Sequence, residues 1–332
     1  MSFSEGVSVF RKFILALGVA LGLAAPAAAQ QKELNFGIIA TDAVSVQRDR
    51  WQPFLDDMQK ATGYKINAFF APDYNGIIEA MRFNKVQVAW YGNKAAMEAV
   101  DRADGEIFAQ VVYADGSVGY NSLLLVHADS PIKSLDDVLK APKQYTFGNG
   151  DPNSTSGFLV PSYYVFALNK IDPTSHFKAV RAGNHASNML AVLNKQVDIA
   201  TNNTEQWHVL ETQQPEKVKE LRVIWKSPLI PSDPFVWRKD LPAETKQKLK
   251  DFVYGYGKTP EQKAVLAKIY NYAAFRPSTN AQLIPIRQLE LFKDRQKAEN
   301  STALSEAEKK AKLAEIDAKL AELDKQAKQL TN

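Results

Sequence analysis

The chain has 332 residues, of which 45% are hydrophobic, and it contains no cysteine. A chain of this length can bury more than one core, and the lack of cysteine excludes disulfides and thiolate metal sites. The formal net charge of +4 is nearly balanced for this length and gives no indication of nucleic-acid binding.

The first 29 residues have the pattern of a secretory signal peptide. Arg11 and Lys12 precede the apolar run 13–25, and small residues up to Ala29 form a cleavage site. The run is short for a bilayer, so cleavage after Ala29 is favoured over the alternative of a membrane anchor. No later run is apolar enough to span a membrane, and we expect the mature protein to act outside the cytoplasm.

After residue 30, short apolar runs that predict strands alternate with amphipathic segments that predict helices. This alternation is typical of an α/β fold with mostly parallel sheets. Pro161 is expected to kink its helix or to delay the regular start of that helix. The predicted strands cover residues 32–40, 65–71, 87–92, 120–128, 144–150, 176–183, 197–203 and 221–230. The predicted helices cover residues 51–62, 72–85 with a leading loop, 134–140, 159–170, 188–196, 243–257 and 260–270.

This order of elements predicts two α/β lobes. Lobe 1 is expected to comprise residues 30–125 and 236–290, and lobe 2 residues 126–235. The chain would then cross between the lobes near residues 123–128 and near residues 228–237.

The C-terminal residues 291–332 are expected to form a helical tail. Ser305 and Glu308 have the spacing of a capping box. Beyond them runs a narrow apolar stripe with alternating spacings of 3 and 4, made of Leu313, Ile316, Leu320, Leu323, Ala327 and Leu330. Such a stripe is typical of a helix-to-helix seam, so we expect a homodimer through this helix. A helix that lies on its own domain is the alternative.

The segment FGNGDPNSTSGFLVP, residues 147–161, joins a predicted strand to a predicted helix. The start of a helix exposes backbone N–H groups and carries partial positive charge. Ser154, Thr155 and Ser156 would add hydroxyl donors there, and Gly157 would allow close approach to the backbone. One hydroxyl is enough for capping, so three favour a seat for a tetrahedral anion.

The sequence contains no motif that indicates catalysis or metal binding. It has neither G-x-S-x-G nor G-x-x-x-x-G-K-[ST], and its four histidines form no H-E-x-x-H pair. We therefore expect no enzyme activity, no catalytic residue, no metal and no cofactor. A hydrolase that uses Ser154 or Ser156 as its nucleophile is a weaker alternative.

Several long segments, together with residues 147–161, are specific enough to compare with known families. These are LNFGII, FFAPDYNGII, MRFNKVQVAWYGN, TNNTE, VIWKSPLIPSDPFVWRK and PIRQLELF. Over about residues 34–292 the chain resembles the periplasmic phosphonate-binding proteins of bacterial ABC importers. The resemblance implies a two-lobed periplasmic binding protein of type II that closes on its ligand and delivers it to a membrane permease. The ligands would be alkylphosphonates of the 2-aminoethylphosphonate type.

The resemblance also implies which residues form the binding site. The phosphonate oxygens would be held by Ser154, Thr155, Ser156, Tyr74, Tyr120 and His185. The ligand's ammonium group would be held by Glu205 and Asp233. Around His185 the sequence reads RAGNHASN and departs from the family, because Asn184 separates the glycine from the histidine.

Two carboxylates at one end of the site would favour a zwitterion over a bare anion such as phosphate, which leaves them unpaired. Glu205 and Asp233 could instead be surface acids, and Tyr74 and Tyr120 could be core aromatics. Further alternatives are a binding protein for phosphate or phosphite, and a structural adaptor built around the C-terminal helix. Trp90 and Tyr91 are additional candidates for lining the same cleft.

Overall fold

The computed structural model describes residues 32–331, of which the last two are described by their backbone alone. The predicted signal peptide, residues 1–29, lies outside the described residues. Between residues 32 and 331, no helix combines the length and the apolar character needed to cross a membrane.

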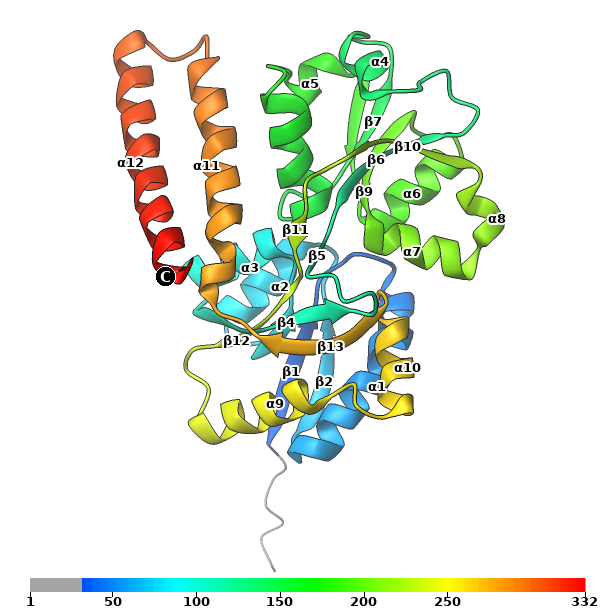
Figure 1. The fold of residues 1–332 in the computed structure, drawn as a ribbon, viewed down its shortest axis with the longest axis vertical. Coiled ribbons are helices and arrows are strands. Elements are labelled where there is room, and N and C mark those ends of the chain that lie inside the picture. Colours follow the sequence, from blue (N-terminus) through cyan, green and yellow to red (C-terminus); the bar gives the residue numbers. More distant parts are fainter. Residues whose placement is uncertain (1–31, 332) are drawn as a thin grey trace, which may run out of the picture. The chain divides into compact units, whose positions relative to one another are not determined.

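Lobe 1 is built on a six-stranded sheet with the order β13-β4-β12-β3-β1-β2 (Figure 1). Its strands are β1 (Glu33–Ile38), β2 (Lys65–Phe70), β3 (Val88–Trp90), β4 (Gly105–Tyr113), β12 (Pro234–Arg238) and β13 (Tyr272–Pro277). Its helices are α1 (Val44–Thr62), α2 (Tyr74–Arg82), α3 (Asn93–Arg102), α9 (Ala243–Gly255) and α10 (Pro260–Lys268). One cluster of buried aromatic and aliphatic side chains, which includes Phe36, Trp51, Phe54 and Phe235, forms the core between these layers.

Lobe 2 is built on a five-stranded sheet with the order β10-β6-β9-β7-β8. Its strands are β6 (Ser122–His127), β7 (Thr146–Asn149), β8 (Ala179–Ala182), β9 (Ile199–Asn203) and β10 (Leu221–Lys226). Its α-helices are α4 (Leu135–Leu139), α5 (Pro173–His176), α6 (His185–Leu193), α7 (Thr204–Gln213) and α8 (Pro215–Val218). Two smaller buried clusters cover its two faces.

The two-lobed α/β fold is confirmed, and most strands of each sheet run in one direction, but both sheets are mixed. In lobe 1, β12 and β13 run antiparallel to their neighbours, and in lobe 2 β6 does the same. Strands β6 and β12 are the first to follow each crossing between the lobes. They enter their sheets directly from the hinge, without the helical crossover that a parallel neighbour requires.

The hinge between the lobes is a two-stranded ribbon of β5 (Gly119–Tyr120) and β11 (Ile230–Pro231), which pair antiparallel. The predicted lobe boundaries at 125/126 and 235/236 therefore lie a few residues too late, inside β6 and β12. Strand pairing explains the difference, since each of these strands belongs wholly to one sheet. The sequence patterns also missed β4 and β13 as strands.

The helical segment after β7 contains two π-helical stretches, η1 (Thr155–Leu159) and η2 (Ser162–Ala167). They flank Val160 and Pro161, so the helix begins earlier than predicted and departs from α geometry around the proline. Pro161 lacks the N–H that an α-helical bond would use, and the wider π turn accommodates such a gap.

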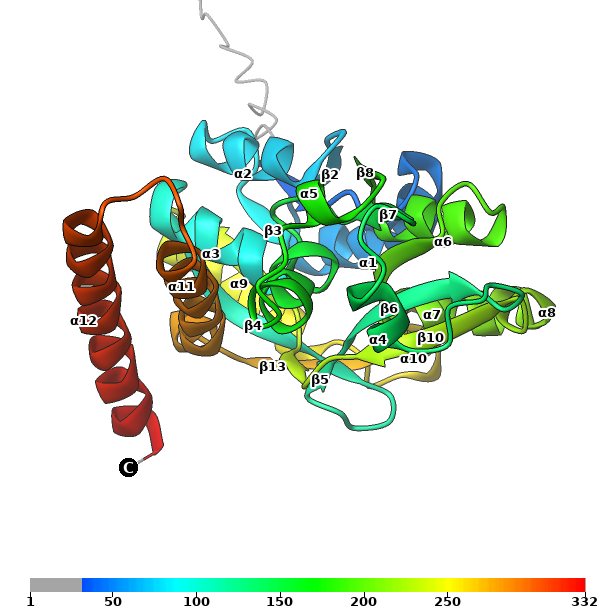
Figure 2. The same ribbon diagram turned by 90° about the horizontal axis from the view of Figure 1, so that it is seen from above.

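The C-terminal tail forms a pair of helices, α11 (Ile284–Glu299) and α12 (Glu306–Thr331), which follow η3 (Asn280–Leu283). Both views show α12 beside α11 (Figures 1 and 2). Ile316, Leu320 and Leu323 of the stripe are buried within the chain, and Arg295 Nε donates to Asp317 Oδ1 across the pair at 2.8 Å. The stripe of α12 therefore does form a helix-to-helix contact, but its partner is α11 of the same chain. The stripe thus gives no reason to expect a second copy, because periodicity does not distinguish an internal partner from an external one.

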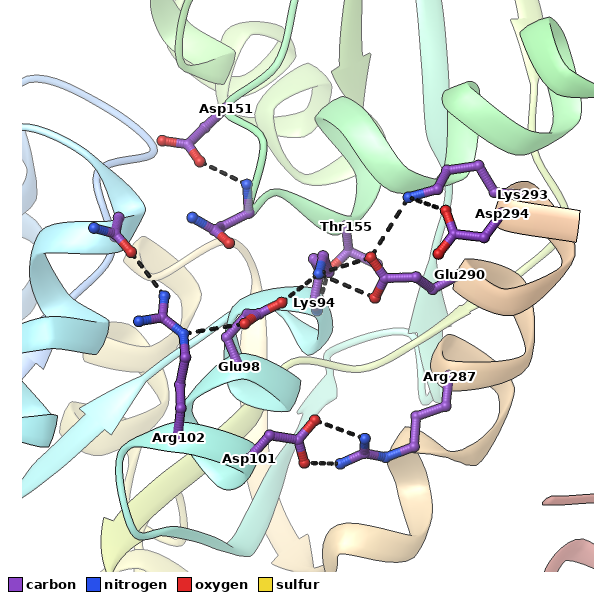
Figure 3. A network of polar contacts seen from close by, with 12 residues as sticks. Lys94, Glu98, Asp101, Arg102, Asp151, Thr155, Arg287, Glu290, Lys293 and Asp294 are labelled. Carbon is purple, nitrogen blue, oxygen red and sulfur yellow. Dashed lines mark hydrogen bonds and ion pairs between the residues drawn. The ribbon is translucent and has the colours of Figure 1, made fainter. Parts of the chain in front are cut away.

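Helix α11 also contacts both lobes. Ile286 and Leu289 join the core of lobe 1, while the ring of Phe292 stacks on Tyr163 of η2 with a centroid distance of 5.9 Å. Lys94 of α3 lies between Glu98 and Glu290, with its Nζ at 2.5 and 2.9 Å from their carboxylate oxygens (Figure 3). Helix α11 therefore packs across the boundary between the lobes.

We expect Leu320→Asp to release α12 from α11, because an unpaired buried carboxylate costs more than a single helix pair provides. Hydrogen exchange over residues 306–331 should become roughly 10-fold to 100-fold faster, which corresponds to a loss of about 1.4–2.8 kcal/mol. The exposed control Lys325→Asp should leave exchange unchanged. A parent protein that is a dimer in light scattering and becomes a monomer with Leu320→Asp would show that the stripe has an external partner.

Candidate ligand-binding site

The structure brings together all eight residues that the sequence predicted for the site. Each is at most 6% exposed, and they come from both lobes and the hinge: Tyr74, Tyr120, Ser154, Thr155, Ser156, His185, Glu205 and Asp233. Burial contradicts the alternative that Glu205 and Asp233 are surface acids. Six of the eight lie in the first turn of a helix or at its cap, where side chains and free N–H groups face the same space.

The three hydroxyls form a connected group at the start of η1. Ser154 caps this helix, since its Oγ accepts the Gly157 N–H at 3.0 Å. The Oγ atoms of Ser154 and Ser156 lie 3.4 and 3.3 Å from Nε2 of His185. Thr155 Oγ1 accepts the Lys94 N–H from lobe 1 at 2.8 Å, a contact seen in Figure 3. The hydroxyls therefore join helix starts of both lobes.

Gly157 and Gly150 are required by close packing beneath this group. A Cβ atom at Gly157 would lie 2.8 Å from Ser154 Oγ and 3.2 Å from the ring of His185. A Cβ atom at Gly150 would lie 2.4 Å from the carbonyl of Gly157, whose oxygen accepts the Gly150 N–H. The glycines of the segment thus let the loop fold tightly enough to present its hydroxyls.

The cluster of Ser154, Thr155 and Ser156, together with His185, carries no full positive charge. Burial lowers the pKa of His185 to about 4, so its imidazole is neutral at neutral pH. Partial positive charge comes instead from the helix starts at Thr155, His185 and Asn93. Neutral donors combined with helix starts are suited to a tetrahedral oxyanion.

The other end of the site contains two buried carboxyl groups. Glu205 Oε1 accepts hydrogen bonds from the hydroxyls of Tyr113 at 2.8 Å and Tyr272 at 3.2 Å. Asp233 Oδ1 is buried and has no hydrogen-bond partner in the described part of the chain. No described lysine, arginine or histidine forms an ion pair with either group; Arg50, which acts on Glu205 over a distance, is paired with Asp42 at 3.4 Å.

Burial without a cation raises the pKa of both groups. The pKa of Glu205 rises to about 7 because its carboxylate is removed from water. Burial and then the charge of Glu205 raise the pKa of Asp233 well above its ordinary value. A positive charge placed between them would offset both effects, so this end of the site is suited to a cation.

The two ends of the site adjoin each other at Gly92, the cap of α3. A Cβ atom there would lie 3.3 Å from Thr155 Oγ1 and 3.9 Å from Asp233 Oδ1. The side chain of Tyr74 interacts with Ser154, and that of Tyr120 interacts with Asp233. A ligand with an anion and a cation only a few bonds apart would match this spacing.

Several residues that shape the site were not predicted. Tyr113 is the last residue of β4 and Tyr272 the first residue of β13, the two strands that the sequence patterns missed. Asn203, within the quoted TNNTE segment, donates to Ser156 Oγ at 3.2 Å, and Asp151 accepts the Tyr74 N–H at 3.2 Å. Tyr91, proposed for the cleft, lies in the core of lobe 1 and donates to the Ile77 carbonyl.

Trp90, the other candidate for lining the cleft, also packs in the core of lobe 1. Its ring stacks on Tyr270 with a centroid distance of 5.7 Å and lies 5.1 Å from the ring of Trp51. Outward of Glu205 a pocket of about 320 Å³ opens, with Tyr113, Tyr120 and Trp207 among its lining residues. The acidic end is therefore the end that approaches solvent.

Comparison with known proteins now identifies the family. The family model for periplasmic phosphonate substrate-binding proteins of ABC transporters matches residues 36–283. The chain belongs to this family.

Individual relatives and solved structures give the degree of similarity. The phosphonates-binding periplasmic protein of Escherichia coli K12 is 60% identical over 287 residues, which cover 86% of this chain and 84% of the relative. The binding protein component of a phosphonate ABC transporter from Pseudomonas aeruginosa has 56% identity and a TM-score of 0.89, and the match covers 91% of this chain and 100% of that one. A phosphate-import protein of Mycolicibacterium smegmatis is 30% identical over 227 residues, which cover 65% of this chain and 70% of the relative.

This periplasmic phosphonate-binding protein is thus the substrate-binding component of an ABC importer and not an enzyme. The hydrolase alternative is wrong, and Ser154 and Ser156 have no nucleophilic role. The conclusion also excludes the alternative of a structural adaptor.

The raised pKa values predict how pH affects closure of the ligand-free protein. Separation of the lobes would return Glu205 and Asp233 to water, so the closed form binds more protons than the open form. Closure is therefore favoured below the ordinary pKa of Glu205, 4.5, and becomes less favourable as pH rises toward 7. From Glu205 alone the closing equilibrium should change on the order of 100-fold over this window.

Small-angle scattering of the ligand-free protein at pH 5 and pH 8 tests this expectation. The radius of gyration should be smaller at pH 5 for the parent. A Glu205→Gln/Asp233→Asn variant should remain closed at both values, because it has no charge to desolvate. An identical pH response in parent and variant would contradict the explanation.

Proposed function

We propose that this periplasmic protein captures aminoalkylphosphonates, with 2-aminoethylphosphonate as the type, and delivers them to the permease of its importer. The observation that carries the proposal is the buried pair Glu205 and Asp233. This pair lies beside a neutral seat for an anion and forms no ion pair with any lysine, arginine or histidine among the described residues. A zwitterionic ligand pairs its phosphonate with the hydroxyl end and its ammonium with the acidic end. An alkylphosphonate without an amino group would leave the two carboxyl groups without a positive charge.

The phosphonate group would lie at the hydroxyls of Ser154, Thr155 and Ser156. Tyr74, Tyr120 and His185 would complete this end, because they already contact these hydroxyls or the adjacent Asp233. A phosphonate has one to two negative charges near neutral pH and three oxygens that accept hydrogen bonds. Short hydroxyl donors at helix starts stabilise such an anion.

The ammonium group would lie between Glu205 and Asp233. Asp233 Oδ1, which has no partner in the described chain, would gain a charge-assisted hydrogen bond. The ligand would also lower the pKa of both carboxyl groups, because a nearby positive charge favours their ionised form. Ligand binding therefore supplies the charge that the closed site lacks.

Closure follows from contacts that join the lobes around the ligand. Thr155 accepts the Lys94 N–H, and Glu205 accepts the hydroxyls of Tyr113 and Tyr272. Since the ligand would touch residues of both lobes, it binds the closed state more tightly than the open one and shifts the population toward it. The permease would then receive the closed, loaded protein.

A second candidate ligand is inorganic phosphate, because a phosphate-import protein is among the relatives of this chain. The acidic pair argues against it, since phosphate would leave Asp233 Oδ1 unpaired next to a second anion. Calorimetric titration of the purified protein with 2-aminoethylphosphonate, ethylphosphonate and phosphate compares these ligands directly. We expect tight binding of 2-aminoethylphosphonate at one site, weaker binding of ethylphosphonate and little binding of phosphate.

The variant Glu205→Gln/Asp233→Asn should lose roughly 100-fold or more in affinity for 2-aminoethylphosphonate, because it lacks the charges that bind the ammonium group. Its affinity for ethylphosphonate, which lacks the amino group, should change less than tenfold. Glu216→Gln, at an exposed position of α8, is the matched control and should bind both ligands as the parent does. Equal losses for both ligands would overturn the assignment of the acidic pair.

The variant Thr155→Val tests the anion seat separately. Valine keeps the shape of threonine but removes the hydroxyl that bonds the Lys94 N–H across the lobes. We expect about tenfold weaker binding of 2-aminoethylphosphonate and ethylphosphonate alike, measured by calorimetry. If only the affinity for 2-aminoethylphosphonate fell, Thr155 would act on the amino group and not on the phosphonate, which would contradict the proposal.

A further inference from the structure

Two tyrosine hydroxyls converge on one oxygen of Glu205. Tyr113 and Tyr272 are directly opposite each other in the antiparallel pair of β4 and β13, and their rings meet edge to face at 5.5 Å. Both hydroxyls donate to Oε1 of Glu205, at 2.8 and 3.2 Å. The pair comes from lobe 1 and its acceptor from lobe 2, so these two hydrogen bonds exist only when the lobes are closed.

Both hydroxyls act as donors at any working pH. Burial, followed by the charge of Glu205, raises the pKa of Tyr113 and of Tyr272 well above the ordinary value, so neither phenol ionises. Neither hydroxyl has another hydrogen-bond partner among residues 32–331. Glu205 therefore accepts from two neutral donors whose only role in the described structure is this contact.

The two oxygens of Glu205 consequently differ. Oε1 has two donors, whereas Oε2 has only the Asn203 amide at 3.5 Å. A carboxylate oxygen with two donors has little capacity left for a ligand. Oε2 is the oxygen that remains for a cation.

We infer that Tyr113 and Tyr272 are specificity-determining residues: in the closed state they hold Glu205 as a carboxylate and orient its free oxygen toward the ligand's amino group. This inference rests on the proposed function and adds the residues that set its selectivity for amines. It also links selectivity to closure, because the open protein would lack both donors.

The charges around Glu205 make this role testable through pH. The groups that face it are Arg50 from α1, Tyr113 from β4, Tyr120 from β5, Asp233 before β12, and Tyr270 and Tyr272 at β13. Burial raises the pKa of Glu205, and the two tyrosine hydroxyls act against this rise. Removal of the hydroxyls should raise the pKa further and leave Glu205 protonated at neutral pH, when it can no longer bind an ammonium group.

The experiment compares Tyr113→Phe, Tyr272→Phe and the double variant with the parent protein. Calorimetry gives the affinities for 2-aminoethylphosphonate and ethylphosphonate from pH 6 to pH 8.5, and the ratio of the two measures selectivity for the amine. In the double variant this ratio should fall roughly 10-fold to 100-fold near pH 6.5 and recover as pH rises, because Glu205 then loses its proton. The single variants should have affinity ratios between those of the parent and the double variant.

Tyr64→Phe is the matched control, since Tyr64 is a buried tyrosine of lobe 1 whose hydroxyl bonds Thr245 at 3.0 Å, away from the site. Its ratio should equal that of the parent at every pH. If the double variant lost affinity for both ligands equally, with a ratio that does not depend on pH, the tyrosines would serve only as contacts between the lobes. This result would overturn the inference. A parent that does not prefer the amine would instead refute the proposed function, so the two failures are distinguishable.

Discussion

The site is organised by the burial of two neighbouring carboxyl groups that form no ion pair with a cation in the described part of the chain. Glu205 and Asp233 come from different segments, one at the start of α7 and the other between the hinge and β12, and the packing of the two lobes places both in the site. In the closed protein each group makes the ionised form of the other less favourable. A ligand that carries a positive charge relieves this, so capture of ligand and closure of the lobes favour each other.

The anionic end is built on a different principle. Its donors are hydroxyls, a neutral imidazole and helix starts, and no lysine or arginine side chain was found to contact the hydroxyls of Ser154, Thr155 and Ser156 among the described residues. Fixed dipoles of this kind hold an oxyanion without a mobile counter-charge. A full positive charge there would also attract bare phosphate. Under the proposed function, selectivity for an amine would therefore be decided at the acidic end.

The frame around the site connects it to the rest of the molecule. Lys94 donates its backbone N–H to Thr155 in the seat, while its ammonium group lies between Glu98 and Glu290 (Figure 3). Through Glu290 this contact reaches α11, which packs on both lobes and carries α12 along its other side. The C-terminal helices thus belong to the two-lobed body, as an internal support rather than a separate module.

The local features of this protein can be predicted from its amino-acid sequence. The alternation of apolar and amphipathic segments predicted an α/β fold in two lobes, and the S-T-S-G segment predicted an anion seat at a helix start, because these patterns depend on neighbours along the chain. The resemblance to phosphonate-binding proteins added Tyr74, Tyr120, His185, Glu205 and Asp233.

The features that depend on distant segments become visible only in the three-dimensional structure. The sheets proved mixed because β6 and β12 enter from the hinge, and the stripe of α12 found its partner in α11. Tyr113 and Tyr272 lie far apart in sequence from Glu205, in strands that no local pattern revealed, and only the packing of lobe 1 against lobe 2 places their hydroxyls at its carboxylate. The sequence could name residues suited to an anion and a cation, but their mutual distances and burial, which set the pKa values, come from the packing of one lobe against the other.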